Sequence, residues 1–206
     1  MVKDEYLGIA KNYDTVWSHY THITLDEIRK YLPSNLDSFN ILDYGCGTGE
    51  FIIKALMNFN NINKIVGFDP SLTMLEIAAN KLSNMDDTYK ITLTSEASDI
   101  ASLNQKFDLI VCSNVFHYFK NPQNELKKFK DLITDDGLII LLDYSKSSFF
   151  AHYFEWLIKI YDTLHIKAYS KNQAEEQLNL SGLKILESKK FRVSFLWKCW
   201  IFKTTK

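Results

Sequence analysis

Residues 39–51, FNILDYGCGTGEF, lead from an apolar run into three glycines at alternate positions. The run predicts a buried strand, and residues 48–59 that follow predict a helix. A glycine-rich turn at a helix N-terminus is typical of nucleotide sites, because free N–H groups and the helix dipole meet there. The spacing is G-x-G-x-G, with Glu50 at the third position of the dinucleotide fingerprint. Because a carboxylate there would repel a pyrophosphate, and no Walker A sequence is present, a different ligand is indicated.

Acidic residues stand at or just after the ends of three consecutive predicted strands, at Asp43, Asp69 and Glu96. The carboxyl ends of parallel strands meet at one edge of a sheet, where such sheets bind ligands. Asp69 lies roughly 20 residues beyond the glycine loop, where an acid can hydrogen-bond a ribose diol. Asp43 suits a cationic ligand group better than a phosphate. The three acids predict a ligand with a ribose, an adenine-like ring and a positive charge, and without phosphate.

Composition narrows the class of protein. The chain has 206 residues, 46% hydrophobic and 24% charged, which suits a single globular domain. The net charge is -1 and the only arginines are Arg29 and Arg192, which weighs against a nucleic-acid reader. The three cysteines form no C-x-x-C pair, so we expect no metal site and no disulfide framework, and a cytoplasmic location. No signal peptide and no apolar run of membrane-spanning length is evident, so no stable membrane insertion is expected.

Strand and helix patterns alternate along most of the chain. Strands are predicted at 39–44, 63–69, 89–94, 107–114 and 137–144, and helices at 21–32, 48–59, 71–84, 121–133 and 172–182, with a short helical stretch near 100–103. Residues 183–203 predict two further strands with a tight connection. The fold class is therefore α/β: a Rossmann-like, doubly wound, seven-stranded sheet with five parallel strands and an antiparallel C-terminal pair. Ser71 is a predicted N-cap and Gly182 a predicted C-cap.

Four segments in order resemble one family. ILDYGCGTGEF (41–51), VGFDPSLTML (66–75), KFDLIVCSNVFHYFKNP (106–122) and DLITDDGLIILLDYS (131–145) resemble motifs of the class I S-adenosylmethionine-dependent methyltransferases, of the small-molecule, type 11/12-like kind. The resemblance implies S-adenosylmethionine as cofactor, S-adenosylhomocysteine as product, and methyl transfer to a small-molecule acceptor. It divides a single domain into an N-terminal helical lid (1–37), a cofactor-binding core (38–145) and substrate-side helices with the final strand pair (146–206).

The resemblance also implies roles for individual residues. Asp43 would hold the glycine loop and the cofactor ammonium, and Asp69 would take the ribose hydroxyls. Glu96 would accept from the adenine amino group, with Asp99 as a rival because the register of this loop is open. The cofactor-binding residues predicted in this way are Tyr13, Asp43, Gly45, Cys46, Gly47, Asp69, Pro70, Ser71, Glu96, Ala97 and Asn114.

The acceptor side is less defined. His117 lies beside the predicted methyl-transfer point and can act as a general base. The alternative is packing or substrate contact, because a sulfonium methyl needs only proximity and in-line approach. The predicted substrate-binding residues are Trp17, Tyr118, Asp143 and Tyr144. The aromatic run 149–169 is either core and lid packing or a pocket for an apolar or aromatic substrate.

Two other classes of function stay open on the sequence. One is a regulatory protein that binds S-adenosylmethionine without catalysis. The other is a nicotinamide-dependent oxidoreductase, which would use the same glycine-loop fold with a different ligand.

Overall fold

The computed structural model describes residues 10–33, 38–85, 90–146, 166–195 and 197–206. Most of the predicted aromatic run lies outside these residues. No helix of the described part is long and apolar enough to cross a bilayer.

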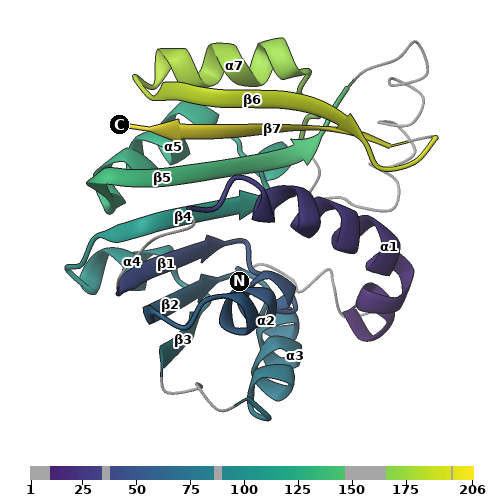
Figure 1. The fold of residues 1–206 in the computed structure, drawn as a ribbon, viewed down its shortest axis with the longest axis vertical. Coiled ribbons are helices and arrows are strands. Elements are labelled where there is room, and N and C mark those ends of the chain that lie inside the picture. Colours follow the sequence, from purple (N-terminus) through teal and green to yellow (C-terminus); the bar gives the residue numbers. More distant parts are fainter. Residues whose placement is uncertain (1–9, 34–37, 86–89, 147–165, 196) are drawn as a thin grey trace.

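One seven-stranded sheet organises the chain (Figure 1). Its order is β3-β2-β1-β4-β5-β7-β6, and β7 runs antiparallel to both of its neighbours. The strands are β1 (Phe39–Tyr44), β2 (Ile62–Phe68), β3 (Ile91–Thr94), β4 (Phe107–Ser113), β5 (Ile133–Tyr144), β6 (Lys184–Arg192) and β7 (Lys198–Thr205). The predicted fold class is thus confirmed. The strand order reverses between β1 and β4, and this switch point is where open α/β sheets bind ligands.

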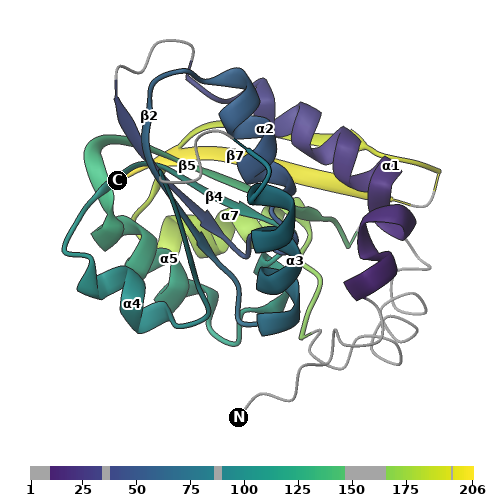
Figure 2. The same ribbon diagram turned by 90° about the horizontal axis from the view of Figure 1, so that it is seen from below.

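Helices cover both faces of the sheet (Figure 2). One face carries α1 (Ala10–Arg29), α2 (Glu50–Asn58) and α3 (Leu72–Leu82), and the other carries α4 (Ala97–Ser102), α5 (Pro122–Leu132) and α7 (Lys171–Leu180). Central strands therefore bury alternate residues in opposite cores. Ile41 belongs to the cluster under α2, whereas Leu42 belongs to the cluster under α5. This explains why the parallel strands are apolar on both faces.

Local signals in the sequence account for most helix ends. Ser71 caps α3, since its hydroxyl accepts a hydrogen bond from the Met74 backbone N–H at 3.2 Å, and Gly182 follows α7 with φ +71. Both predicted caps are confirmed. β5 begins at Ile133 rather than at residue 137, because residues 134–137 form an irregularity between two stretches of pairing with β4. Polar residues in this irregularity hid the start of the strand.

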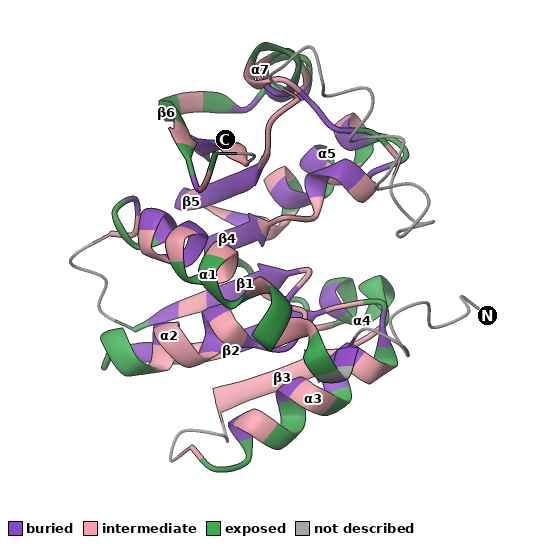
Figure 3. Cartoon of the chain, turned by 90° about the vertical axis from the view of Figure 1, so that its right-hand side faces the viewer, coloured by how far each residue is buried: buried purple, intermediate pink, exposed green. Residues whose placement is uncertain are grey.

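The first helix is longer than predicted. It begins at Ala10 and ends at Arg29, and tight turns continue through Leu32. Figure 3 shows α1 crossing in front of the ends of β1 and β4, with buried and exposed residues on opposite sides. This position makes α1 a cover over the carboxyl edge of the sheet.

Candidate functional site

A cavity of about 640 Å³ opens at the carboxyl edge of β1, β2 and β4, beneath α1. This volume lies within the range of small-molecule and cofactor sites. Its walls come from α1, the glycine loop, the end of β2, the loop after β4 and the start of α5. Nine of the predicted site residues line it: Tyr13, Asp43, Gly45, Cys46, Gly47, Asp69, Pro70, Asn114 and Tyr118.

The glycine loop is held against β2. The backbone N–H groups of Gly45 and Cys46 both donate to the carbonyl oxygen of Phe68, at 2.7 and 2.9 Å. Gly45 has φ +84, and a Cβ there would lie 2.1 Å from the side chain of Val115. Gly47 has φ +51, and a Cβ there would meet nothing within 4 Å. Gly45 therefore permits close packing on the loop after β4, while the backbone at Gly47 borders open space.

Asp69 fastens the end of β2 to this loop. One carboxylate oxygen accepts from the Gly47 backbone N–H at 2.9 Å, and the other accepts from the Ser71 backbone N–H at 2.9 Å. A carboxylate has about four lone-pair sites, so these bonds are compatible with further hydrogen bonds from ligand hydroxyls. The arrangement fixes the carboxylate at the cavity wall, where the sequence predicted a ribose contact.

Asp43 is the most unusual group of the site. It is 2% exposed, and its Oδ2 atom has no hydrogen-bond partner. Burial, with a smaller contribution from the nearby Asp69 carboxylate, raises the pKa of Asp43 to about 8. An unpaired buried carboxylate is costly unless a cation neutralises it. The residues present therefore fit a ligand that brings an ammonium or sulfonium charge to this point.

An ion-pair cluster joins α1 to the glycine loop and α3. The Lys81 ammonium lies 2.9 Å from Asp14 and 2.5 Å from Glu50. The Thr48 hydroxyl donates to Asp14 at 2.6 Å. Glu50, which the sequence treats as a barrier to pyrophosphate, is thus paired in the structure. Only Glu50 of these residues was singled out from the sequence, because a pairing between residues 14 and 81 has no local signal.

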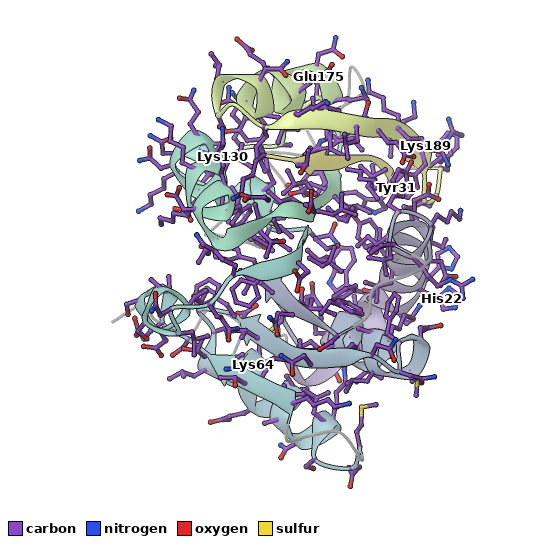
Figure 4. The ribbon with its side chains drawn as sticks, turned by 60° about the vertical axis from the view of Figure 1, so that its left-hand side comes forward. His22, Tyr31, Lys64, Lys130, Glu175 and Lys189 are labelled. Atoms are coloured by element: carbon purple, nitrogen blue, oxygen red, sulfur yellow. The ribbon has the colours of Figure 1, made fainter. Side chains whose placement is uncertain are left out.

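The other end of α1 is attached to the C-terminal hairpin. The buried Glu27 accepts from Lys189 of β6 at 2.8 Å and from Lys30 at 2.7 Å. Figure 4 shows Lys189 beside Tyr31, which follows α1. The helix is therefore fixed at both ends across the cavity.

Asn114 stands at the end of β4 on the cavity wall. Its φ of +59 is left-handed, which is uncommon for a side-chain-bearing residue. Its backbone N–H donates to Leu142, and its side-chain oxygen accepts from the Tyr20 hydroxyl at 2.8 Å. The Tyr20 hydroxyl also lies 3.3 Å from the Cys199 sulfur. The α1 helix thereby orients the side chain at the predicted methyl-transfer point.

His117 and Asp143 form a buried pair next to this point. The Nδ1 atom of His117 lies 3.0 and 2.9 Å from the two carboxylate oxygens. Asp143 is 1% exposed and does not line the cavity, so the expectation that it faces the pocket is corrected. Its carboxylate is turned instead toward His117 and the backbone of Tyr144.

Several other predicted residues lie away from the cavity wall formed by the described part of the chain. Glu96 and Ala97 are exposed at the start of α4, and Asp99 accepts from Thr94 at 2.6 Å. Trp17 and Tyr144 both contact Trp197 through edge-to-face ring packing. Ser71 caps α3, as described above. The residues that sequence reasoning missed are Asp14, Tyr20, Thr48, Lys81 and Trp197.

The fold and the site together define an α/β protein with a cofactor-sized cavity at the strand switch point. A family model described as a methyltransferase domain matches residues 16–188. The chain therefore belongs to this methyltransferase family, which confirms the resemblance inferred from the motifs.

Individual relatives agree with this family. The chain is 28% identical over 145 residues to a malonyl-[acyl-carrier protein] O-methyltransferase of Ilyobacter polytropus, covering 68% of this chain and 52% of the relative. It is 26% identical over 166 residues to a ubiquinone/menaquinone biosynthesis C-methyltransferase of Wigglesworthia glossinidia brevipalpis, covering 79% and 64%. The chain thus spans about half to two thirds of the length of these relatives. The solved structure of a magnesium protoporphyrin IX methyltransferase from Synechocystis, with bound S-adenosylhomocysteine, superposes with a TM-score of 0.72 at 16% identity, covering 98% of this chain and 97% of that one.

Proposed function

We propose that the protein transfers a methyl group from S-adenosylmethionine to a small-molecule acceptor. The observation that carries the proposal is the unpaired, buried Asp43 carboxylate on the cavity wall beside the glycine loop. S-adenosylmethionine brings an ammonium and a sulfonium charge and has no phosphate. Such a ligand neutralises Asp43, whereas a dinucleotide would bring a pyrophosphate toward Asp43, Asp69 and Glu50.

In this proposal, each part of the cavity holds one part of the methyl donor. Asp43 and the backbone of Gly47 hold the amino-acid end, and Asp69 holds the ribose hydroxyls. Pro70 borders the base, and Tyr13 closes over the donor from α1. The donor supplies an activated methyl group, which would lie beside Asn114. We keep Glu96 and Ala97 as adenine contacts only if the ligand reaches beyond the wall described above.

A small molecule is the acceptor that the chain supports best. The net charge of -1 and the presence of only two arginines offer little to a nucleic acid. Aromatic side chains at Tyr118 and Phe119 on the cavity wall suit an apolar or aromatic acceptor. The three cysteines are free and buried, which is consistent with a reducing cytoplasm.

Calorimetric titration separates this function from a nicotinamide oxidoreductase. Purified protein is titrated with S-adenosylhomocysteine and, separately, with NADH. We expect binding of the first and none of the second. Tight binding of NADH without a response to S-adenosylhomocysteine would overturn the assignment.

Label transfer separates catalysis from a regulatory role. Protein and S-adenosylmethionine labelled in the methyl group are incubated with small-molecule fractions of a cell extract. We expect label in a new small molecule, and loss of that product in Asp43→Asn. Asp135→Asn is the matched control, since Asp135 is an exposed carboxylate that pairs with Lys206 far from the cavity. Binding of S-adenosylhomocysteine with no transfer to any fraction would favour the regulatory role.

A further inference from the structure

We infer that His117 and Asp143 accept the proton of the acceptor, and that the acceptor atom carries a proton before methylation. The acceptor would then be a hydroxyl, a phenol or an activated C–H group rather than a carboxylate. This inference rests on the proposed function and adds the chemical class of the acceptor to it.

The first step of the reasoning is the way Asp143 is held. One carboxylate oxygen accepts from the His117 backbone N–H at 3.0 Å, and the other accepts from the Tyr144 backbone N–H at 2.7 Å. The His117 ring lies 2.9 to 3.0 Å from both oxygens. Three donors converge on one buried carboxylate, so the carboxylate is fixed as an acceptor.

The second step is the tautomer of the imidazole. A carboxylate accepts hydrogen bonds only, so Nδ1 of a neutral His117 carries the proton that points to Asp143. The basic lone pair is then on Nε2. In such a pair the carboxylate orients the ring and stabilises the imidazolium that forms when Nε2 takes a proton. A histidine that served packing alone would gain nothing from a charged partner in a buried position.

The third step is the setting of the pair. His117 lies in η2 (Phe116–Tyr118), between wall residues Asn114 and Tyr118, and its carbonyl oxygen accepts from the backbone N–H groups of residues 166 and 167. Its ring packs on Tyr118, with ring centroids 3.9 Å apart, and on Tyr144, with centroids 4.8 Å apart. The pair is therefore beside the predicted methyl-transfer point and shielded by aromatic rings.

Other titratable groups around the pair stay neutral. Burial raises the pKa of Tyr20 well above its usual value, and it does the same for the Cys112 thiol. Burial also raises the pKa of Cys199 to about 12. The titratable groups that face His117 or Asp143 from the described elements are Tyr20, Cys112, Tyr118, Tyr144 and Cys199. Asp143 is thus the charged neighbour of His117.

The chemistry of methyl transfer then selects the acceptor. The acceptor atom forms a bond to the methyl carbon, and the methyl–sulfur bond breaks with its electron pair on sulfur. The proton of the acceptor passes to Nε2 of His117 and then to water. A carboxylate is already ionised near neutral pH and has no proton to give, so it needs no such pair. The two relatives named above differ in this respect, since one methylates oxygen of a malonyl group and the other methylates carbon.

Alkaline treatment of the labelled product tests the acceptor class directly. Methyl esters of carboxylic acids release volatile labelled methanol in alkali, whereas methyl ethers and C-methyl groups keep the label. We expect the product from the extract to be stable in alkali. Release of labelled methanol would overturn the inference and leave the proposed function intact, while failure to bind S-adenosylhomocysteine would overturn the proposed function itself.

Two variants test the pair. His117→Gln removes the proton acceptor, and Asp143→Asn is isosteric but removes the charge. For both we expect unchanged calorimetric binding of S-adenosylhomocysteine and a fall in turnover of about 100-fold or more. We expect the turnover of Asp143→Asn to recover toward high pH, where the acceptor ionises in solution. Full turnover in a folded Asp143→Asn protein would overturn the inference.

A readout independent of turnover guards against misfolding. Long-range ¹H–¹⁵N spectra of the histidine rings report which nitrogen carries the proton. We expect Nδ1–H for His117 in the unmodified protein and a change in Asp143→Asn; Nε2–H in the unmodified protein would overturn the inference. The matched control is His22→Gln, because His22 lies 3.2 Å from Asp26 but is 68% exposed on α1 (Figure 4). It should leave turnover and the His117 signal unchanged, and an equal fall in turnover would also overturn the inference.

Discussion

Replacing Asp43 by asparagine should stabilise the free protein and weaken its binding of S-adenosylhomocysteine. The pKa of Asp43 is raised from 3.8 to about 8 by burial and by Asp69. Between these values the folded chain holds a proton that the unfolded chain has lost, so stability falls as the pH rises from about 4 to about 8. At pH 7 this destabilisation amounts to about 4 kcal/mol as an upper limit, from about 1.4 kcal/mol per pKa unit.

The asparagine variant removes this pH-dependent destabilisation. For a domain of this size, roughly 2–4 °C of melting temperature corresponds to 1 kcal/mol. We expect Asp43→Asn to melt several degrees higher than the unmodified protein at pH 7 and at nearly the same temperature at pH 4. Differential scanning calorimetry at the two pH values gives the comparison, with Asp135→Asn as the control.

Ligand binding should show the opposite effect. Asp43 must ionise to pair with an ammonium group, so binding in the unmodified protein should release a proton. The affinity for S-adenosylhomocysteine should rise by up to tenfold per pH unit between about pH 6 and pH 8. Titration calorimetry in buffers of different ionisation enthalpy counts the proton. Equal melting temperatures at pH 7, together with equal and pH-independent affinity in Asp43→Asn, would refute the reasoning.

Three further variants test other parts of the account. Gly45→Ala should lower the free energy of unfolding by about 2 kcal/mol or more in urea denaturation, because φ is +84 and the new Cβ meets Val115; an unchanged midpoint would contradict this. Lys81→Met removes the ion pair with Asp14, so S-adenosylhomocysteine should dissociate faster in stopped-flow measurements; an unchanged rate would mean that α1 does not control release. Ser170→Ala breaks the capping box of α7 and should cost about 1 kcal/mol of stability with no change in ligand affinity.

The sequence predicts the fold well because its signals are local. Strand β1 matches the predicted residues 39–44, and Ser71 caps the helix that follows β2, as its position before an apolar periodic segment indicates. The start of β5 was missed because polar residues in the strand irregularity resemble a loop.

The site is predicted only where it follows the backbone. Asp43 and Asp69 lie at strand ends, and topology alone brings them together. The pairing of Tyr20 with Asn114 spans 94 residues and depends on how α1 packs across the sheet, so no local pattern indicates it. The His117–Asp143 pair depends on β4 and β5 being neighbours. Its members were predicted individually, with Asp143 in a different role.

A crystal structure with S-adenosylhomocysteine tests the central claim most directly. The account predicts the ligand in the cavity beneath α1, with its amino nitrogen at hydrogen-bond distance, about 2.7–2.9 Å, from the Asp43 carboxylate and its sulfur beside Asn114. A ligand bound elsewhere, or bound in the cavity with its amino group turned away from Asp43, would contradict the account.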